Sequence, residues 1–252
     1  MIDDSVSDHA WRPGEGTESA VITDGRIEIV EVSAASRTML AEAPADHSSL
    51  AWHPAGGILA YVRDGSLWLH NVEDGNVREV SNRIAGMFGP TPVEWSESGD
   101  HLATLTETDA ETLALSVFAP FDADDDATTA FRFAPSPTEE VVTDTFDWAG
   151  ETLVFARDLL DGTTRQYCVA DLSTEPRKAD HRAVLSEHDD RGLAPAVIVG
   201  HASGKVALVS PTTGHHHVYV LDVTGELPVE SEPLSDAASG VTQVTSGEFE
   251  AR

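Results

Sequence analysis

The sequence has very little lysine and a single cysteine. Only two of its 15 basic residues are Lys, against 44 Asp and Glu, and the formal net charge is −29 at pH 7. Such a chain lacks the basic patch that phosphates require, which excludes a general nucleic-acid binder and electrostatic attraction to an anionic membrane. The lone Cys168 cannot form an internal disulfide, so we expect a reducing, cytoplasmic compartment.

Long apolar runs are also missing. The longest, such as residues 193–199, fall far short of the roughly 20 residues that a transmembrane helix needs. The N-terminal residues Met-Ile-Asp-Asp-Ser are acidic and lack the apolar region of a signal peptide, so none is expected. Because 40% of the 252 residues are hydrophobic, the chain can still build a core, and it is not a disordered acidic tail.

The excess of acidic residues is typical of proteins from organisms that keep molar salt in the cytoplasm. Thirteen of the 15 basic residues are Arg, and Ala and Asp are abundant. A net charge of this size opposes compactness at low ionic strength, and salt screens it, since the Debye length falls to about 3 Å at 1 M. We therefore expect a halophilic protein whose fold loosens as salt is removed; the alternative is an ordinary acidic protein.

The chain repeats itself. Residues 10–13, Ala-Trp-Arg-Pro, recur as Ala-Trp-His-Pro at 51–54, an offset of 41, and residues 20–29 align with 60–69 at an offset of 40. The one-residue slip falls in the turn between the two blocks, where a change of length is tolerated. Three more divergent copies begin near residues 93, 146 and 198, which gives five repeats over about 1–46, 47–85, 86–142, 143–192 and 193–252 of one domain, 1–252.

Each repeat is predicted to consist of short strands. In residues 66–71, Leu67 and Leu69 alternate with polar neighbours and Trp68 lies on the opposite face, and the Asp-Gly pairs at 24–25 and 64–65 predict type I′ hairpin turns. Further strands are expected at residues 37–41, 76–80, 129–133 and 182–185. Four antiparallel strands every 40 to 50 residues predict an all-β fold, a β-propeller with about five visible blades, and leave open an incomplete larger propeller. A β-sandwich is the alternative fold.

The repeat resembles a known one. The segments 51–61, Ala-Trp-His-Pro-Ala-Gly-Gly-Ile-Leu-Ala-Tyr, and 95–103, Trp-Ser-Glu-Ser-Gly-Asp-His-Leu-Ala, are similar to the TolB-type repeat, a variant of WD40. Such repeats also form the N-terminal propellers of the prolyl oligopeptidase family, the S9 peptidases, which includes dipeptidyl and acylaminoacyl peptidases. The resemblance implies a propeller beside an α/β-hydrolase domain. Residues 242–248 look like the outer strand that precedes another blade.

The serine-peptidase motif Gly-x-Ser-x-Gly is absent from the sequence. The nearest segment, residues 200–204, has Ala202 at the central position, and Ser203 is one residue away from the place of the nucleophile. A strand rather than a helix is predicted after it, so we interpret it as a blade turn. The chain is therefore not expected to be an enzyme by itself.

Other motifs have weak functional alternatives. Glu139 and Glu140 resemble the paired glutamates that bind a substrate's amino group in dipeptidyl peptidases, but an acidic chain contains such pairs by chance. Three histidines at 215–217 suit a hairpin turn better than a metal site, and Cys168 is expected in the core. No metal and no cofactor is expected, and a hydrated loop is the simplest interpretation of four further acidic residues, which are Asp122, Asp124, Asp125 and Asp126.

Two functions from different classes remain open. The first is a non-catalytic propeller module like the substrate filter of a prolyl-oligopeptidase-type peptidase, with the hydrolase domain elsewhere; the alternative is a TolB-like scaffold for a protein or peptide. A propeller enzyme with a site in the central channel is weaker, because no convergent set of carboxylates is seen. The expected partner is a peptide, a protein or an α/β-hydrolase domain. The candidate ligand-facing or inter-blade aromatics are Trp11, Trp52, Trp95 and Trp148.

Overall fold

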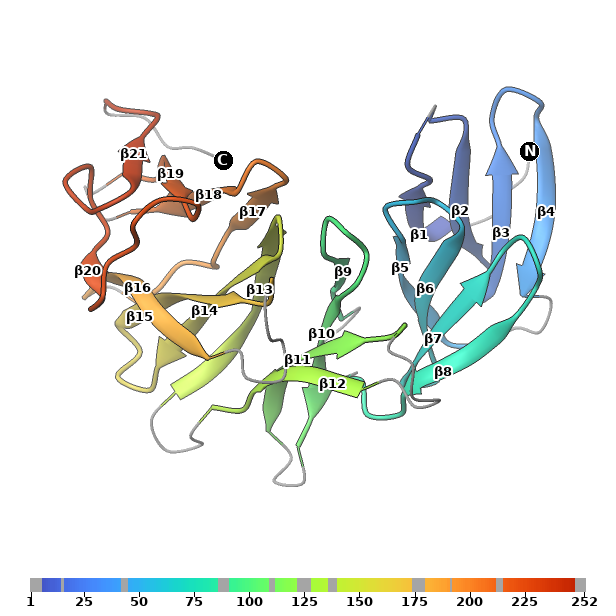
Figure 1. Cartoon of the computed structure of the whole chain (residues 1–252), viewed down its shortest axis with the longest axis horizontal. Coiled ribbons are helices and arrows are strands. Elements are labelled where there is room, and N and C mark those ends of the chain that lie inside the picture. The colour runs from blue at the N-terminus through green and yellow to red at the C-terminus, as the bar shows by residue number, and fades with distance from the viewer. Residues whose placement is uncertain are drawn as a thin grey trace. The chain divides into compact units, whose positions relative to one another are not determined.

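The computed structural model describes residues 6–14, 16–41, 45–85, 91–108, 112–121, 128–135, 140–173, 180–190, 192–211 and 215–247. Within these ranges the chain forms 21 β-strands and no α-helix, which confirms the all-β prediction (Figure 1). Accordingly, none of the described segments is a helix able to span a membrane. The strands assemble into five sheets, in which neighbouring strands are consecutive in the chain except for the pairs β16–β20 and β19–β21.

The chain divides into two compact units. The first unit comprises Met1–Trp95, Gly99–Glu111 and Ser116–Thr129, and the second comprises Ser96–Ser98, Thr112–Leu115 and Ala130–Arg252. The expectation of a single domain over residues 1–252 stays a prediction.

The first unit contains two complete four-stranded antiparallel sheets. The strands of the first sheet, in spatial order, are β1 (Val6–Trp11), β2 (Glu18–Thr23), β3 (Arg26–Glu31) and β4 (Ser36–Ala41). Those of the second are β5 (His47–Trp52), β6 (Ile58–Arg63), β7 (Ser66–Asn71) and β8 (Val77–Ser81).

The third sheet has the order β12-β11-β10-β9, and the boundary between the units falls within two of its strands, β11 and β12. Its strands are β9 (Val93–Trp95), β10 (Leu102–Glu107), β11 (Leu113–Ala119) and β12 (Thr128–Phe133).

The second unit contains the fourth and fifth sheets. The fourth has one strand more than predicted, because β20 (Glu232–Pro233) pairs in parallel with β16. Its other strands are β13 (Glu140–Ala149), β14 (Thr152–Leu159), β15 (Thr164–Asp171) and β16 (His181–His188). The fifth consists of β17 (Ile198–His201), β18 (Lys205–Ser210), β19 (His217–Asp222) and β21 (Val241–Gln243), so the C-terminal segment supplies the outer strand of this same sheet.

The hairpins form where the Asp-Gly pairs predict them. At the β2–β3 turn φ is 51° for Asp24 and 69° for Gly25, and at the β6–β7 turn it is 50° for Asp64 and 77° for Gly65. Positive φ at both central residues is what a type I′ turn requires, and it matches the right-handed twist of the flanking strands. The turns therefore fix the registers in which Thr23 faces Arg26 and Arg63 faces Ser66.

The middle strand β7 of the first unit buries both faces, but against different cores. Leu67 and Leu69 of β7 pack into one apolar cluster with Ala60, Val62 and residues of β9 and β10. Trp68 packs against the other cluster, which includes residues of β2 and β3. This confirms the predicted alternation in β7, and it shows that successive sheets stack face to face in this unit.

Contacts between successive sheets are concentrated on their first strands. In the first unit β1 adjoins β5 and β5 adjoins β9, and in the second unit β13 adjoins β17. This arrangement is expected of blades that approach one another along their inner edges. The core of the second unit includes the fully buried Tyr167 and Tyr219, and it also buries Cys168, as predicted.

Candidate functional site

Two of the four predicted tryptophans lie between sheets of the first unit. The indole Nε1 of Trp52 donates to the carbonyl oxygen of Ala10 at 3.1 Å, and that of Trp95 donates to the carbonyl of Ala51 at 3.2 Å. Only 6% of Trp52 and 9% of Trp95 is exposed. These bonds satisfy the one donor of a buried indole and tie each sheet to the preceding one.

The other two tryptophans differ from these and from each other. Trp148, near the end of β13, is 5% exposed, and Gly200 of β17 lies directly against its carbonyl oxygen. Gly200 N–H also donates to Asp147 Oδ2 at 2.8 Å. Trp11, at the end of β1, is 54% exposed.

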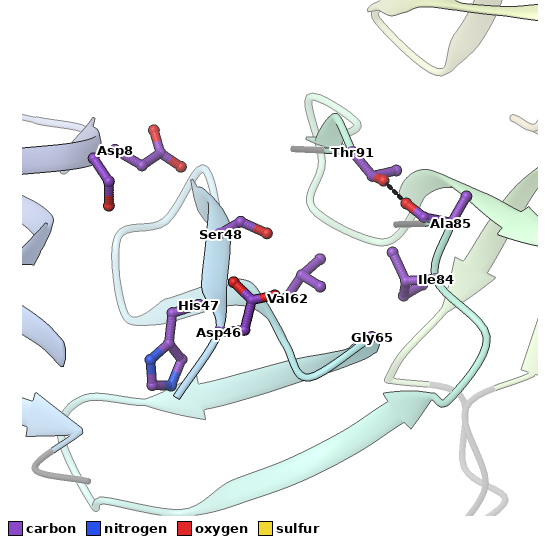
Figure 2. A pocket seen from close by; sticks show the side chains of 10 residues that line it. Asp8, Asp46, His47, Ser48, Val62, Gly65, Ile84, Ala85 and Thr91 are labelled. Carbon is purple, nitrogen blue, oxygen red and sulfur yellow. Dashed lines mark hydrogen bonds between the residues drawn. The ribbon is translucent and has the colours of Figure 1, made fainter. Parts of the chain in front are cut away.

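A cavity of about 310 Å³ opens at the beginnings of the first strands of the first two sheets. Figure 2 shows that the side chains of Ser48, Val62 and Ile84 converge on it, while the ring of His47 points away. Thr91 Oγ1 donates to the carbonyl of Ala85 at its rim. The described residues that line it are Ser7, Asp8, Asp46, His47, Ser48, Val62, Gly65, Ile84, Ala85 and Thr91.

A β-bulge shapes this cavity. The register of β5 against β6 shifts between Ser48 and Ala51, and Ser49 adopts φ of 59°. A bulge removes backbone groups from the ladder, so they need other partners. Here Asp8 Oδ2 accepts a hydrogen bond from Leu50 N–H at 3.0 Å, and Asp8 Oδ1 accepts one from His9 N–H at 2.8 Å. The carboxylate of Asp8 therefore holds β1 to β5.

His47 beside the cavity is a buried histidine with a structural contact. Its Nδ1 lies 2.9 Å from the carbonyl oxygen of Gly25, and because a carbonyl only accepts, Nδ1 carries the proton. The ring packs edge-on against Tyr61, with centroids 5.6 Å apart. Burial raises the pKa of Tyr61. Both rings therefore belong to the packing between the first two sheets.

A second cavity, of about 400 Å³, lies at the opposite ends of β5 and β9. It combines indole and proline rings with the carboxylate of one exposed residue, Glu94. Its lining is Pro13, Leu50, Ala51, Trp52, Pro54, Val93, Glu94 and Trp95. Rings of this kind bind extended peptide segments through flat apolar contact, and a carboxylate can orient an amino group or an Arg side chain.

Aromatic and cationic groups extend the rim of this second cavity. Arg12 lies over the Trp52 ring at 5.3 Å and donates to Gly56 O and Glu18. Trp95 stacks on Phe121 with centroids 6.0 Å apart, and His53 packs edge-on against Trp95 at 4.9 Å. Burial lowers the pKa of His53, so this ring is neutral at pH 7.

The segment that comes closest to a nucleophile elbow is a hairpin turn between β17 and β18, as expected. Gly204 has φ of 73°, and its N–H donates to the carbonyl of His201 at 2.9 Å. Ser203 N–H donates to His201 Nδ1 at 3.0 Å, and Ser203 Oγ lies 2.9 Å from the same nitrogen. The contact closes an exposed turn, and the strand β18 follows where an elbow would need a helix.

The remaining sequence candidates do not assemble into a site. Glu140 pairs with Arg157 Nη1 at 2.6 Å, whereas Glu139 lies outside the described residues. His217 is buried in β19 with Nδ1 3.2 Å from Thr245 Oγ1, and no three acidic, His or Cys side chains of the described segments are placed to share a metal. Also outside the described residues are Asp122, Asp124, Asp125 and Asp126.

One polar cluster was not predicted. Arg165 of β15 faces Asp158 of β14 and Glu187 of β16 in register, with N–O distances of 2.7 Å and 3.2 Å. Burial raises the pKa of Glu187, against the opposing effects of a hydrogen bond with Ser210 and of Arg165. Only the strand register brings the three side chains together, so the sequence offers no signal for it. A buried pair of this kind stabilises little by itself but is costly to break.

No protein-family model and no curated protein matches the chain. Solved structures do. Dipeptidyl peptidase 4 from Porphyromonas gingivalis superposes with a TM-score of 0.70 at 12% identity, over 100% of this chain and 41% of that one. A putative dipeptidyl aminopeptidase IV from Bacteroides ovatus superposes with a TM-score of 0.62 at 14% identity, and the match covers 92% of this chain and 38% of that one. TolB from Acinetobacter baumannii superposes with a TM-score of 0.50 at 13% identity, and the match covers 94% of this chain and 52% of that one.

The chain thus spans about half or less of the length of these structures. At these identities the likeness concerns the fold alone. Together with the five sheets, it shows an all-β propeller architecture of about five four-stranded antiparallel blades, with the likeness to prolyl-oligopeptidase-type and TolB propellers that the repeats predict.

Proposed function

We propose that this chain is a non-catalytic propeller module that admits an extended peptide, as in the substrate-filtering propeller of a prolyl-oligopeptidase-type serine peptidase. The observation that carries the proposal is the cavity between β5 and β9. It places Trp52 and Trp95 beside two proline rings and the carboxylate of Glu94, in a space of about 400 Å³.

The chemistry of this cavity favours a peptide over a folded surface. A space of this size takes a few side chains, and its ring-lined walls give affinity without requiring a particular sequence. The net charge of −29 favours peptides with positive groups, which Glu94 would orient. In this function, selection is by size and unfolding, and peptide hydrolysis belongs to an α/β-hydrolase domain.

The test is a binding titration by intrinsic fluorescence and calorimetry. The ligands are unfolded basic peptides and a folded protein of similar charge. Saturable binding of the peptides alone supports the proposal. Glu94→Lys should weaken binding by roughly threefold to tenfold, since an exposed charge pair contributes about 0.2–1 kcal/mol and the reversed charge adds repulsion. Glu79→Lys makes the same charge change on the exposed outer strand β8 and should leave binding unchanged.

Two further measurements separate the proposal from its competitors. Hydrolysis of a peptide p-nitroanilide by the purified chain, abolished by a serine-directed inhibitor, would overturn the non-catalytic assignment. An α/β-hydrolase domain with a nucleophile elbow, encoded in the same or the neighbouring reading frame, supports the filter. Peptide binding without such a domain favours a TolB-like interaction scaffold instead.

A further inference from the structure

One buried carboxylate lies where the fourth and fifth sheets meet. Glu187 of β16 belongs to the fourth sheet, and its side chain is only 3% exposed. It forms a hydrogen bond with Ser210 of β18, which is fully buried in the fifth sheet. Both strands belong to the second unit, so the contact lies within one compact part of the molecule.

A single guanidinium serves two carboxylates at this contact. Arg165 Nε and Nη2 donate to the two oxygens of Asp158 at 2.7 Å and 3.0 Å, the bidentate geometry of a strong pair. Glu187 Oε1 accepts one bond, from Arg165 Nη1 at 3.2 Å, and the same nitrogen donates to the Ala194 carbonyl at 2.8 Å. One positive charge therefore compensates two negative charges, and Glu187 has the weaker share.

The second oxygen of Glu187 has no donor of its own. Neither Glu187 Oε2 nor the Tyr167 hydroxyl makes a hydrogen bond of ordinary geometry to another described residue. The two groups lie near each other, because Tyr167 follows Arg165 by two residues on β15 and Arg165 is in register with Glu187. Burial, and then the negative charge of Glu187, raise the pKa of Tyr167. A buried charged oxygen without its full set of donors is costly.

Other titratable groups on the strands beside Glu187 have partners of their own. His217 of β19 is in register with Ser210, and its Nδ1 lies 3.2 Å from Thr245 Oγ1. Two further pairs flank β16, namely His188 with Asp190 and Glu232 with Ser239. Arg165 is therefore the cation on which the charged form of Glu187 depends.

A proton on Glu187 resolves this imbalance. It removes the surplus negative charge from the contact and leaves the bidentate pair of Arg165 with Asp158 intact. The protonated carboxyl also gains an O–H donor, which the oxygen of the Tyr167 hydroxyl can accept. In agreement with this geometry, burial raises the pKa of Glu187.

We propose that Glu187 makes the packing of the fifth sheet on the fourth depend on pH. When it holds a proton, the contact with Ser210 is neutral and β18 stays packed against β16. When it loses the proton, a poorly compensated charge remains between the sheets, and β18 and β19 open more readily.

The direction of the pH dependence follows from linkage. The packed state holds the proton more tightly than the opened state, in which the pKa returns to its ordinary value of about 4.3. The contribution of this group to packing is therefore complete at low pH. It is lost as the pH rises from that ordinary value towards the higher pKa of the packed state, and it is constant above.

Hydrogen exchange of the whole chain, followed by mass spectrometry between pH 5 and 8 in molar KCl and corrected for the intrinsic exchange rate, tests the proposal. In the wild type, opening of β18 and β19 should increase by up to about tenfold per pH unit until the pKa of the packed state is passed, because one proton is released on opening. Strands β6 and β7 of the first unit are the internal reference and should not follow this profile.

Three variants locate the effect. Glu187→Gln keeps the shape of the side chain without its charge, and β18 should then open to the same extent at every pH. Asp158→Asn frees the charge of Arg165 for Glu187, so the rise in opening should become smaller and end at a lower pH. Glu230→Gln removes one charge at an exposed position of the same unit and should behave like the wild type.

Opening of β18 that does not depend on pH in the wild type, or a pH dependence that Glu187→Gln retains, overturns the proposal. A second measurement does not require Glu187→Gln to fold. Glutamates labelled with ¹³C at the side-chain carboxyl are titrated by NMR in the wild type and in Asp158→Asn. One carboxyl should titrate above the others and move to lower pH in Asp158→Asn, and the absence of such a carboxyl also overturns the proposal.

Discussion

Gly200 lies so close to Trp148 that a Cβ atom at residue 200 would come within 1.9 Å of the Trp148 carbonyl oxygen. Real Cβ atoms do not approach a backbone oxygen so closely, and neither strand can move without disturbing its own ladder. A glycine at residue 200 is therefore required for β17 to lie this close to the backbone of β13.

Gly200→Ala is expected to destabilise the protein by at least about 1–3 kcal/mol, the usual cost of overpacking a close contact. The measurement is urea unfolding in molar KCl. Gly225→Ala is the matched control, because no atom lies within 4 Å of its Cβ position and its φ is not positive. The control should change stability by less than about 0.5 kcal/mol. Equal effects of the two substitutions would contradict the close contact.

The bond between Trp52 and Ala10 provides a second test. Trp52→Phe keeps a large apolar ring but removes the indole N–H, which leaves the half-buried carbonyl of Ala10 with one partner fewer. We expect a loss of about 1 kcal/mol, together with some loss of packing. Trp11→Phe, at the exposed equivalent position, should be neutral when both are measured at low protein concentration. If Trp11→Phe destabilises the protein under those conditions, the indole of Trp11 makes a stabilising contact, which would contradict its exposure.

Asp8 should be essential to the bulge in β5. Asp8→Ala removes the acceptor of Leu50 N–H, and we expect a loss of about 1–3 kcal/mol from the unsatisfied donor. Asp8→Asn retains a carbonyl oxygen and should lose less. Asp46→Ala changes an exposed carboxylate of the same cavity and should alter the free energy of unfolding by less than about 0.5 kcal/mol. Equal losses for Asp8→Ala and Asp46→Ala would argue against the bridging role.

Cys168 should be inert in the folded protein. Burial raises the pKa of its thiol to about 12, so the reactive thiolate is scarce below that pH. We expect no reaction with a chromogenic disulfide reagent at pH 8 in molar KCl, and one equivalent after addition of denaturant. Since the pKa is higher in the folded state, ionisation of this group favours unfolding once the pH rises above the unfolded value, about 8.5. Rapid labelling of the native chain at pH 8 would show that this strand opens readily.

Salt should stabilise the chain. With a net charge of −29, the thermal midpoint is expected to rise by several degrees between dilute buffer and molar KCl, because screening removes self-repulsion in the compact state. Circular dichroism at the strand minimum measures it. Molar sucrose is the control for general exclusion effects. A midpoint that does not depend on KCl would leave the acidity without a role in stability.

Local signals in the sequence were sufficient for the strands and turns. The positive φ that a tight hairpin needs is supplied by Asp64 and Gly65 themselves, and the alternation in β7 depends only on the period of a strand. The number of strands per repeat and the positions of the second, third and fourth strands followed from these signals, whereas the first strand of each repeat was not located. The small strand β20 did not, because a two-residue parallel pairing leaves no pattern in the sequence.

The candidate site could be predicted only in part. The tryptophans were identified from their recurrence, and Trp52 and Trp95 do line a cavity. The bulge at Ser49, the bond from Leu50 to Asp8 and the charged cluster around Arg165 were not predictable. Asp8 and Leu50 are 42 positions apart and meet through the packing of two sheets, and Arg165 and Glu187 are 22 positions apart and meet through a strand register.

The contrast between Trp11 and Trp52 separates what the sequence determined from what tertiary structure decided. The two residues have nearly the same neighbours, Ala-Trp-Arg-Pro and Ala-Trp-His-Pro, and the sequence alone determined that they occupy equivalent positions in two repeats. Only the assembled sheets decided that Trp52 is buried and bonded while Trp11 is exposed. Local conformation depends on adjacent residues, whereas burial depends on whether another sheet lies alongside, and that information is distributed over the whole chain.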